Sequence, residues 1–316
     1  MVTFKQLRYF DALVRLGHFG RAAEHCAISQ PALSMQISEL ERTLGLVLIE
    51  RGHKAISFTQ AGLEVAARAR RILHEVRDLG DMASQCAGTL NGSLRLGVIP
   101  SIAPYLLPPA LPLLRQRYPG LELHLRETQT RQLVAELEDG QLDVLVLALP
   151  VEDAELETLA LFTDRFLLAL PSDRALNEPV RLTPELLRDN RMLLRGEGHC
   201  LREQALAFCE LRQVDSIDTF GASSLSTLVQ MVANGLGLTL VPEMAAGQES
   251  RGAGIRLLRL ARPEPARTVG LAWRSTSPRH EDFMALGAVL REAMPGMPDV
   301  EPPKPGARAR RRRARS

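Results

Sequence analysis

Cysteine and aromatic residues are scarce in this sequence of 316 residues, which contains four cysteines, one tryptophan and three tyrosines. Few aromatic residues beside many aliphatic ones are the composition we expect of an α/β protein. No apolar run reaches the ~18 residues of a membrane-spanning helix, and the first residues, Met-Val-Thr-Phe-Lys-Gln, are not the start of a signal peptide. We therefore expect a cytoplasmic protein with no membrane contact, in which a structural disulfide would be unusual.

Charge is distributed unevenly, although the formal net charge is only +2 at pH 7. Residues 1–90 carry 11 Lys and Arg against 9 Asp and Glu, residues 301–316 carry 7 against 1, and the stretch between them carries 21 against 27. Basic ends can meet phosphates while an acidic middle keeps the chain soluble. The length allows two or three domains, each with its own core.

Three helices are predicted at the start of the chain. Apolar residues at three- and four-residue spacing predict one helix from Phe4 to Leu16 and a second over residues 19–26. Ser29 is placed as the N-cap of a third helix, with Pro31 in the first turn, where its missing N–H costs little.

The third helix is predicted to have an apolar and a polar side. The apolar side is formed by Leu33, Ile37, Leu40 and Leu44. At 100° per residue, the opposite side carries Pro31, Ser34, Met35, Ser38 and Arg42. This face of small and polar side chains is one that a DNA major groove can accept.

A short basic hairpin is predicted after the third helix. Residues 46–51 indicate a strand, 52–54 a turn and 56–58 the returning strand, with Arg51 and Lys54 near the turn. Three helices followed by such a hairpin favour a winged helix-turn-helix. The same pattern also fits a small helical bundle of no special function.

A long amphipathic helix is predicted next, capped by Thr59 and ending near residue 87. Its apolar stripe consists of Leu63, Ala66, Ala69, Ile72, Leu73, Val76, Leu79 and Met82. The first module is too small to bury this stripe. Packing against a second copy of the chain is one interpretation, and burial inside its own chain is the other.

From residue 92 onward, strands alternate with helices. Strands are predicted at 93–99, 121–126, 142–148, 166–170, 237–242 and 268–273, and helices at 106–118, 130–139, 223–234 and after Pro278. The first of these form the βαβ pattern of a parallel sheet, and the strand at 166–170 begins a second unit. We expect an α/β fold of two subdomains, with a ligand cleft between them at the strand ends.

Two of the four cysteines, Cys200 and Cys209, lie at the two ends of a short predicted helix. Nine helical residues separate their Cα atoms by roughly 13 Å, whereas a disulfide needs them within about 7 Å. The helix must unwind before they can join, which would make the pair a redox switch. The helix N-terminus and a protonated His199 can lower the pKa of the Cys200 thiol. Alternatively, both cysteines are small buried hydrophobes, as we expect of Cys26 and Cys86.

The N-terminal residues resemble the DNA-binding domain of the LysR-type transcriptional regulators. The matching stretches are residues 19–23, 29–34, 48–51 and 58–62, with Ile37, Leu40, Glu41, Leu44 and Gly45. The resemblance implies a winged helix-turn-helix, a linker helix that dimerises, and an effector domain like periplasmic binding proteins. The predicted DNA-binding residues are Gln30, Pro31, Ser34, Met35, Ser38, Arg51 and Lys54.

Within that family the chain resembles the peroxide-sensing OxyR branch. Residues 97–108, 127–130, 198–202 with Cys209, and 264–271 carry this likeness, which covers residues 1–295. It implies that Cys200 is the peroxidatic thiol and Cys209 the resolving thiol. It also implies a peroxide pocket formed by Ser101, Thr130, His199 and Arg267. Position 101 departs from the pattern, where threonine is expected, so the hydroxyl has no neighbouring methyl to restrain it.

The resemblance also sets the expected domains. These are a winged helix-turn-helix at 1–58, a linker helix at 59–89, one subdomain at 90–163 with 267–297, a second at 164–266 and a tail at 298–316. The tail is basic, contains no apolar anchor and is expected to be disordered. It is either an added DNA clamp or a solvated charged end.

The predicted function is a DNA-binding activator and repressor of oxidative-stress genes that senses hydrogen peroxide and needs no metal or cofactor. Its expected partners are promoter DNA, other copies of the chain as a dimer of dimers, RNA polymerase and a thiol-disulfide reductant. Two alternatives are a LysR-type regulator that binds a metabolite in its cleft and a thiol peroxidase. We do not expect an enzyme, because a DNA-binding module has no role in one.

Overall fold

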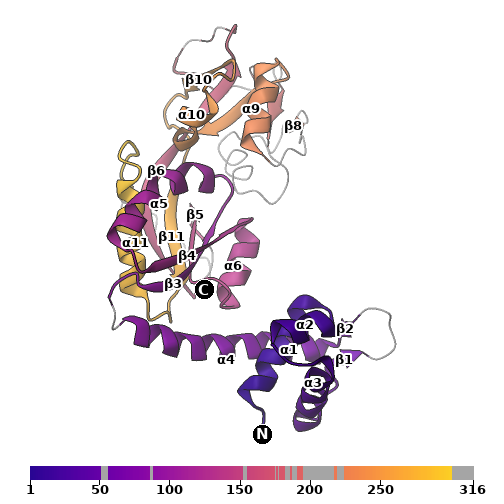
Figure 1. Cartoon of the computed structure of the whole chain (residues 1–316). Coiled ribbons are helices and arrows are strands. Elements are labelled where there is room, and N and C mark those ends of the chain that lie inside the picture. Colours follow the sequence, from indigo (N-terminus) through magenta and orange to yellow (C-terminus); the bar gives the residue numbers. More distant parts are fainter. Residues whose placement is uncertain are drawn as a thin grey trace, which may run out of the picture. The chain divides into compact units, whose positions relative to one another are not determined.

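The computed structural model describes residues 1–300 except 51–55, 86–87, 152–154, 175, 177, 182–185, 187–190, 195–216 and 219–223, with the backbone alone described at 77–78, 81–85 and 217–218. The described chain forms two compact units (Figure 1). One contains residues 1–88, 135–142 and 277–279, and the other contains the remainder. Several predicted sites lie outside the described residues: Arg51, Lys54, Cys86, His199, Cys200, Cys209 and the basic tail from 301.

The first unit begins with three helices, α1 (Phe4–Leu16), α2 (Phe19–His25) and α3 (Gln30–Leu44). Local chemistry sets their ends. The Ser29 hydroxyl accepts a hydrogen bond from the Ala32 N–H at 3.4 Å, which confirms Ser29 as the N-cap of α3. Gly17 and Gly45 end α1 and α3 in the left-handed conformation that glycine adopts without strain.

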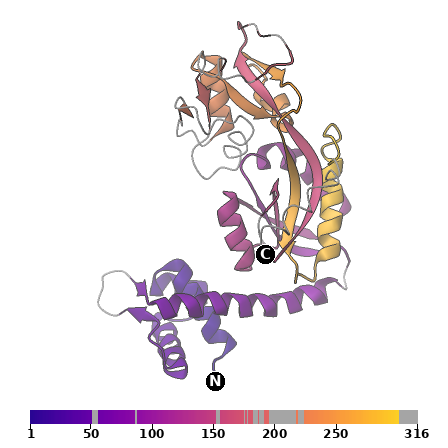
Figure 2. The same ribbon diagram turned by 180° about the vertical axis from the view of Figure 1, so that it is seen from behind.

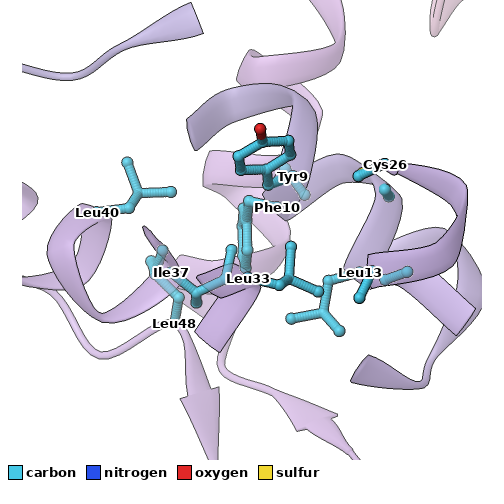
Figure 3. Packing of buried hydrophobic residues seen from close by; sticks show 12 residues of the cluster. Tyr9, Phe10, Leu13, Cys26, Leu33, Ile37, Leu40 and Leu48 are labelled. Atoms are coloured by element: carbon cyan, nitrogen blue, oxygen red, sulfur yellow. The ribbon is translucent and has the colours of Figure 1, made fainter. Parts of the chain in front are cut away.

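The core of this module lies between the three helices and the hairpin (Figure 3). Phe10 and Leu13 of α1 are fully buried, together with Leu33 and Leu40 of α3. Cys26 packs at the edge of the same cluster, as a small hydrophobe. The helices therefore have a single apolar centre, and the polar sides of α3 are left for solvent or a ligand.

The hairpin is shorter than the sequence predicted. Its strands are β1 (Ile49–Glu50) and β2 (Ser57–Phe58), which pair antiparallel. Residues 46–48 are not a strand, because the backbone of Leu48 forms hydrogen bonds to Glu41 of α3 and to Thr59, the N-cap of α4. The N–H of Leu48 donates to the Glu41 carboxylate of α3 at 2.8 Å, and its carbonyl accepts from the N–H of Thr59 at 3.1 Å.

The linker helix α4 (Gln60–Gln85) begins at the predicted cap, since the Thr59 hydroxyl accepts from the N–H of Gly62 at 2.9 Å. The helix packs on α1 through Ala66 and Ala69, which are buried. Farther along its stripe, Ile72, Val76 and Leu79 are exposed in the single chain. The described part of its own chain therefore covers the apolar stripe at Ala66 and Ala69, whereas Leu63 before them is exposed as well.

Gly62→Ala is expected to destabilise the first unit. A Cβ atom at this position would lie 2.2 Å from the carbonyl oxygen of Leu48, which is backbone and cannot move alone. Such overpacking typically costs about 1–3 kcal/mol of unfolding free energy. The control is Gly80→Ala in the same helix, where an added Cβ meets nothing within 4 Å. Chemical denaturation should show a loss for the first variant only, and equal stabilities would contradict the predicted clash.

The second unit is built on a seven-stranded mixed sheet, which confirms the expected α/β fold. Its strands are β3 (Gly92–Val98), β4 (Leu121–Glu127), β5 (Val144–Leu149), β6 (Leu156–Pro171), β9 (Thr239–Pro242), β10 (Ile255–Arg259) and β11 (Ala266–Arg274). The order is β10-β6-β11-β5-β3-β4, with β9 also paired to β6. As predicted, β3 is parallel to β4 and β5, whereas β11 is antiparallel to both of its neighbours.

Strand β6 joins the two parts of this sheet (Figure 2). Its first part, to Arg165, pairs with β11, and its second part, from Phe166, pairs with β9 and β10. The sequence prediction began this strand at residue 166 and missed residues 156–165. The reason is the burial pattern, because the second part is almost continuously apolar and buried while the first part is partly exposed.

Helices and short strands complete this unit. The helices are α5 (Ala103–Arg117), α9 (Leu225–Ala233), α10 (Glu243–Glu249) and α11 (His280–Glu292), and the short strands are β7 (Met192–Leu193) and β8 (Ile217–Asp218). Helix α6 (Thr130–Glu138) begins in this unit, and its residues from 135 onward belong to the first unit. Helices α5 and α11 pack together beside β11 (Figure 1). Helix α10 contacts β6 and β9 on one side and α5 on the other. It was not predicted, because it has only seven residues and a glycine in its middle.

Candidate functional site

The predicted DNA-facing side of α3 is exposed. Gln30, Pro31, Ser34, Met35 and Ser38 are all solvent-accessible in the described chain. The contrast within the helix is large, because Met35 is 63% exposed while Leu33, two residues earlier, is 0% exposed. Helix α3 therefore offers one face to the core and a mostly uncharged face, ending at the exposed Arg42, to a ligand, as a helix that enters a major groove can do.

The base of the hairpin is tied directly to this helix. The Glu41 carboxylate of α3 accepts from the N–H groups of Leu48 at 2.8 Å and Ile49 at 3.3 Å. The Thr59 hydroxyl donates to the carbonyl of Val47 at 2.7 Å. Although the hairpin tip lies outside the described residues, its base is therefore fixed relative to α3.

A fully buried ion pair joins the adjacent antiparallel strands β6 and β11. Arg267 and Asp164 are direct partners in the strand register, and the Arg267 Nε atom donates to Asp164 Oδ2 at 2.9 Å. Both side chains are 0% exposed. Asp164 Oδ1 also accepts from the N–H of Met244, in the first turn of α10, at 3.0 Å. A buried carboxylate and guanidinium thus satisfy each other, as buried charges must.

Ser101 occupies the other side of the same guanidinium. Arg267 Nη1 donates to the Ser101 hydroxyl at 2.7 Å, and Nη2 donates to the Ser101 carbonyl at 3.0 Å. Ser101 is itself only 2% exposed. The structure thus brings together two of the four predicted pocket residues. The missing methyl at position 101 matters little for the orientation of the hydroxyl, because Arg267 holds it.

Burial has the largest effect on the pKa of Asp164 in this ion pair. Desolvation raises the pKa of Asp164, and the Arg267 guanidinium with the Met244 N–H offsets part of that rise. The positive charge of Arg267 is in turn balanced by Asp164 at contact distance. Arg267 is therefore better placed to orient Ser101 than to supply an unbalanced positive charge.

Thr130 is the first residue of α6, and its hydroxyl oxygen is buried. Within the described part of the chain this oxygen has no hydrogen-bond partner. No described hydrogen bond joins it to Ser101 or Arg267, so these contacts do not place it in one cluster with them. A buried hydroxyl without a partner can still donate to a small polar ligand.

Among the described residues, no group of His, Cys, Asp and Glu is arranged to hold a metal ion.

Sequence reasoning missed Asp164 and Met244 at this site. Asp164 lies 103 positions before its partner Arg267, and nothing in the local pattern couples the two. One signal was available, an acidic residue two positions before the apolar stretch that begins at Phe166. Such a residue is seldom buried unless it is paired.

No described helix is long and apolar enough to cross a membrane.

Family comparisons match nearly the whole chain. Residues 4–63 match the family described as bacterial regulatory helix-turn-helix protein, lysR family. Residues 87–295 match the LysR substrate binding domain. The two matches follow one another along the chain in the order that the sequence predicted.

Individual relatives are described as OxyR or as hydrogen peroxide-inducible genes activators. The DNA-binding transcriptional dual regulator OxyR of Escherichia coli K12 is 41% identical over 295 residues, 93% of this chain and 97% of that protein. A probable hydrogen peroxide-inducible genes activator of Streptomyces viridosporus is 43% identical over 299 residues, 94% and 96% of the two chains.

Solved structures give the same result. A full-length cysteine-to-aspartate variant of OxyR from Pseudomonas aeruginosa matches with a TM-score of 0.78 at 33% identity, over 96% of this chain and 99% of that chain. A cysteine-to-serine variant of Corynebacterium glutamicum OxyR with hydrogen peroxide bound matches with a TM-score of 0.64 at 35% identity, over 93% and 92%.

Proposed function

Because this chain belongs to the LysR family of bacterial transcriptional regulators, and within it to the OxyR branch, we propose that it controls oxidative-stress genes by sensing hydrogen peroxide through Cys200 and Cys209. The observation that carries the proposal is the exposed polar face of α3 on a chain whose likeness to peroxide-responsive regulators extends over 93% of its length. DNA binding and peroxide sensing then belong to one molecule.

The proposed reaction uses both thiols. The Cys200 thiolate attacks one oxygen of hydrogen peroxide, which forms a sulfenic acid and releases hydroxide. The Cys209 thiol then attacks the sulfenic sulfur, so an S–S bond forms and the S–O bond breaks, and the leaving hydroxide takes the Cys209 proton and departs as water. Two electrons pass from the thiols to the peroxide. A thiol-disulfide reductant returns the pair to thiols, which fits a regulator of the reducing cytoplasm.

The proposed peroxide pocket consists of Ser101, Thr130, His199 and Arg267. In it Arg267 holds Ser101 by donating to the hydroxyl at 2.7 Å and to the backbone carbonyl at 3.0 Å. The buried Thr130 hydroxyl can donate to a peroxide oxygen, because it has no partner among the described residues. His199, next to the thiol in sequence, favours the thiolate and the leaving hydroxide when protonated.

The proposed assembly is a dimer of dimers. The exposed side chains of Ile72, Val76 and Leu79 form an apolar stripe on α4, which a second copy of the helix would cover. Two copies would present two α3 helices to DNA, with RNA polymerase as a further contact. The basic tail is proposed to add backbone contacts to the DNA.

The proposed function is tested by mass spectrometry of the Cys200–Cys209 link before and after sub-stoichiometric peroxide, with operator binding measured in both states. We expect the link to form and the binding to change with it. If no link forms and a small organic ligand alters binding instead, the chain is a metabolite-responsive regulator. Sustained peroxide turnover with a thiol reductant would identify a peroxidase.

Arg51→Ala is expected to weaken operator binding and to lower the salt dependence of binding. Arg51 directly follows β1 in the basic hairpin, where an arginine can meet a DNA phosphate. Loss of one phosphate contact lowers the slope of log K against log salt by about 0.9. The measurement is a salt titration of operator affinity.

The matched control for this test is Arg115→Ala, which removes the same charge from the exposed surface of α5. It should leave the salt slope of operator binding unchanged. An unchanged slope and affinity in Arg51→Ala as well would remove Arg51 from the DNA interface.

A further inference from the structure

A buried carboxylate in the second unit holds two helices at once. Glu249, the last residue of α10, is only 8% exposed. Its Oε1 atom accepts from the Tyr105 hydroxyl at 2.7 Å and from the Ser226 hydroxyl at 2.9 Å. Tyr105 is also 8% exposed. Neither contact is needed for the peroxide pocket, so the cluster requires its own explanation.

The three residues come from helices that belong to different parts of the sheet. Tyr105 lies in the first turn of α5, which directly follows β3 and packs on β4. Ser226 is the second residue of α9, which packs on β6, β9 and β10. Glu249 therefore stands between a helix of the β3–β4–β5 part and a helix of the β9–β10 part.

The N-terminal end of α10 is also held by a hydrogen bond. The N–H of Met244, in its first turn, donates to Asp164, whose partner Arg267 binds Ser101. Ser101 and Tyr105 lie four residues apart, Ser101 in the turn that precedes α5 and Tyr105 in the first turn of that helix. Both ends of α10 are thus linked to the short stretch from Ser101 to Tyr105, and among the described hydrogen bonds the one at Glu249 joins α10 to α9.

Because Tyr105 of α5 and Ser226 of α9 donate to the same carboxylate, a shift of α9 changes the hydrogen bonding of the group that also binds α5. Hydrogen bonds to a buried carboxylate are stronger than those between neutral groups. If α9 moves away from α10, Glu249 loses the partly buried bond from Ser226 and keeps the buried bond from Tyr105, and the helices must find a new arrangement. Packed interfaces respond to such losses by switching between discrete arrangements rather than by gradual deformation.

We propose that Glu249 couples the position of α9 to α5, and so carries the redox signal from the cysteine-bearing stretch to the other part of the sheet. The inference rests on the proposed function, because Cys200 and Cys209 precede α9 in the chain. Glu249 acts as a coupling residue and does not touch peroxide.

The test compares Glu249→Gln with Glu243→Gln, which makes the same change at the other end of α10. The Glu243 carboxylate pairs with half-exposed arginines, Arg259 at 2.6 Å and Arg165 at 4.0 Å, and no described hydrogen bond or ion pair joins it to α9. Two quantities are measured on the full chain: the yield of the Cys200–Cys209 link after peroxide, and the ratio of operator affinities in the reduced and oxidised states.

We expect Glu249→Gln to form the link with the same yield as the unmodified chain, while the affinity ratio falls by about fivefold or more, the lower end of typical couplings between sites. Glu243→Gln should leave both quantities unchanged. Tyr105→Phe and Ser226→Ala each remove one donor and should lower the ratio in the same direction. Tyr105→Phe keeps the buried ring, so it tests the inference even if Glu249→Gln folds poorly.

An unchanged affinity ratio in Glu249→Gln and Tyr105→Phe, with normal link formation, would overturn this inference and leave the proposed function intact. An equal fall in Glu243→Gln would also overturn it, because the effect would then belong to α10 as a whole. A loss of the link itself in Tyr105→Phe would place the cluster in the reaction rather than in the coupling. If the unmodified chain forms no link, the proposed function fails and this inference with it.

Discussion

Arg267→Met is expected to lower the free energy of unfolding of the α/β unit by about 3–5 kcal/mol, because it leaves the carboxylate of Asp164 buried without its partner. Both side chains are 0% exposed, so solvent cannot compensate for the loss. The Ser101 hydroxyl and carbonyl lose their donors as well. Chemical denaturation at pH 7 measures the change.

The control is the double variant Arg267→Met with Asp164→Asn. Asparagine keeps an oxygen that can accept from the N–H of Met244, and it removes the unpaired charge. Replacing both members of a buried ion pair is often far less costly than removing one. The double variant should therefore recover most of the lost stability, and a double variant less stable than Arg267→Met would contradict this account.

The pH dependence of Arg267→Met gives the same prediction a second check. Burial already raises the pKa of Asp164, and loss of the guanidinium removes a group that lowers it. The pKa of Asp164 in the folded variant then lies above its value in the unfolded chain, about 3.9. Protonation favours the folded state under that condition. The stability deficit should be largest at neutral pH and should shrink as the pH falls towards 4.

Local chemistry explains why the helices of the first unit could be predicted. Ser29 caps α3, Thr59 caps α4, and Gly17 and Gly45 end α1 and α3, each through bonds within a few residues. The exposed face of α3 follows from the same helical period. These features depend on neighbours in the sequence, so a single sequence contains them.

Contacts between distant residues could not be predicted in this way. Asp164 and Glu249 pair with residues 103 and 144 positions away, and neither position has a local pattern that identifies its partner. The first part of β6 was missed because its residues are only partly buried, and its strand character comes from pairing with β11. The helix between Cys200 and Cys209 was predicted from local propensity, and it lies outside the described residues.

Cys200→Ser and Cys209→Ser are expected to abolish the disulfide by different routes. Without Cys200, peroxide should meet no fast-reacting thiol, and the protein should remain in its reduced form. Without Cys209, Cys200 should still be oxidised, but its sulfenic acid has no intramolecular partner and persists or oxidises further. Stopped-flow oxidation with a sulfenic-acid trap separates the two, because only Cys209→Ser should yield a trapped adduct.

Cys26→Ala supplies the matched control for these variants. Burial in the core of the first unit raises the pKa of the Cys26 thiol, so little thiolate is available for peroxide. This variant should therefore oxidise at the rate of the unmodified chain. Because the reaction rate follows thiolate and access, equal rates in Cys200→Ser and Cys209→Ser would mean that Cys200 is not the sensing thiol. A trapped adduct in Cys200→Ser would move the first oxidation step to another cysteine.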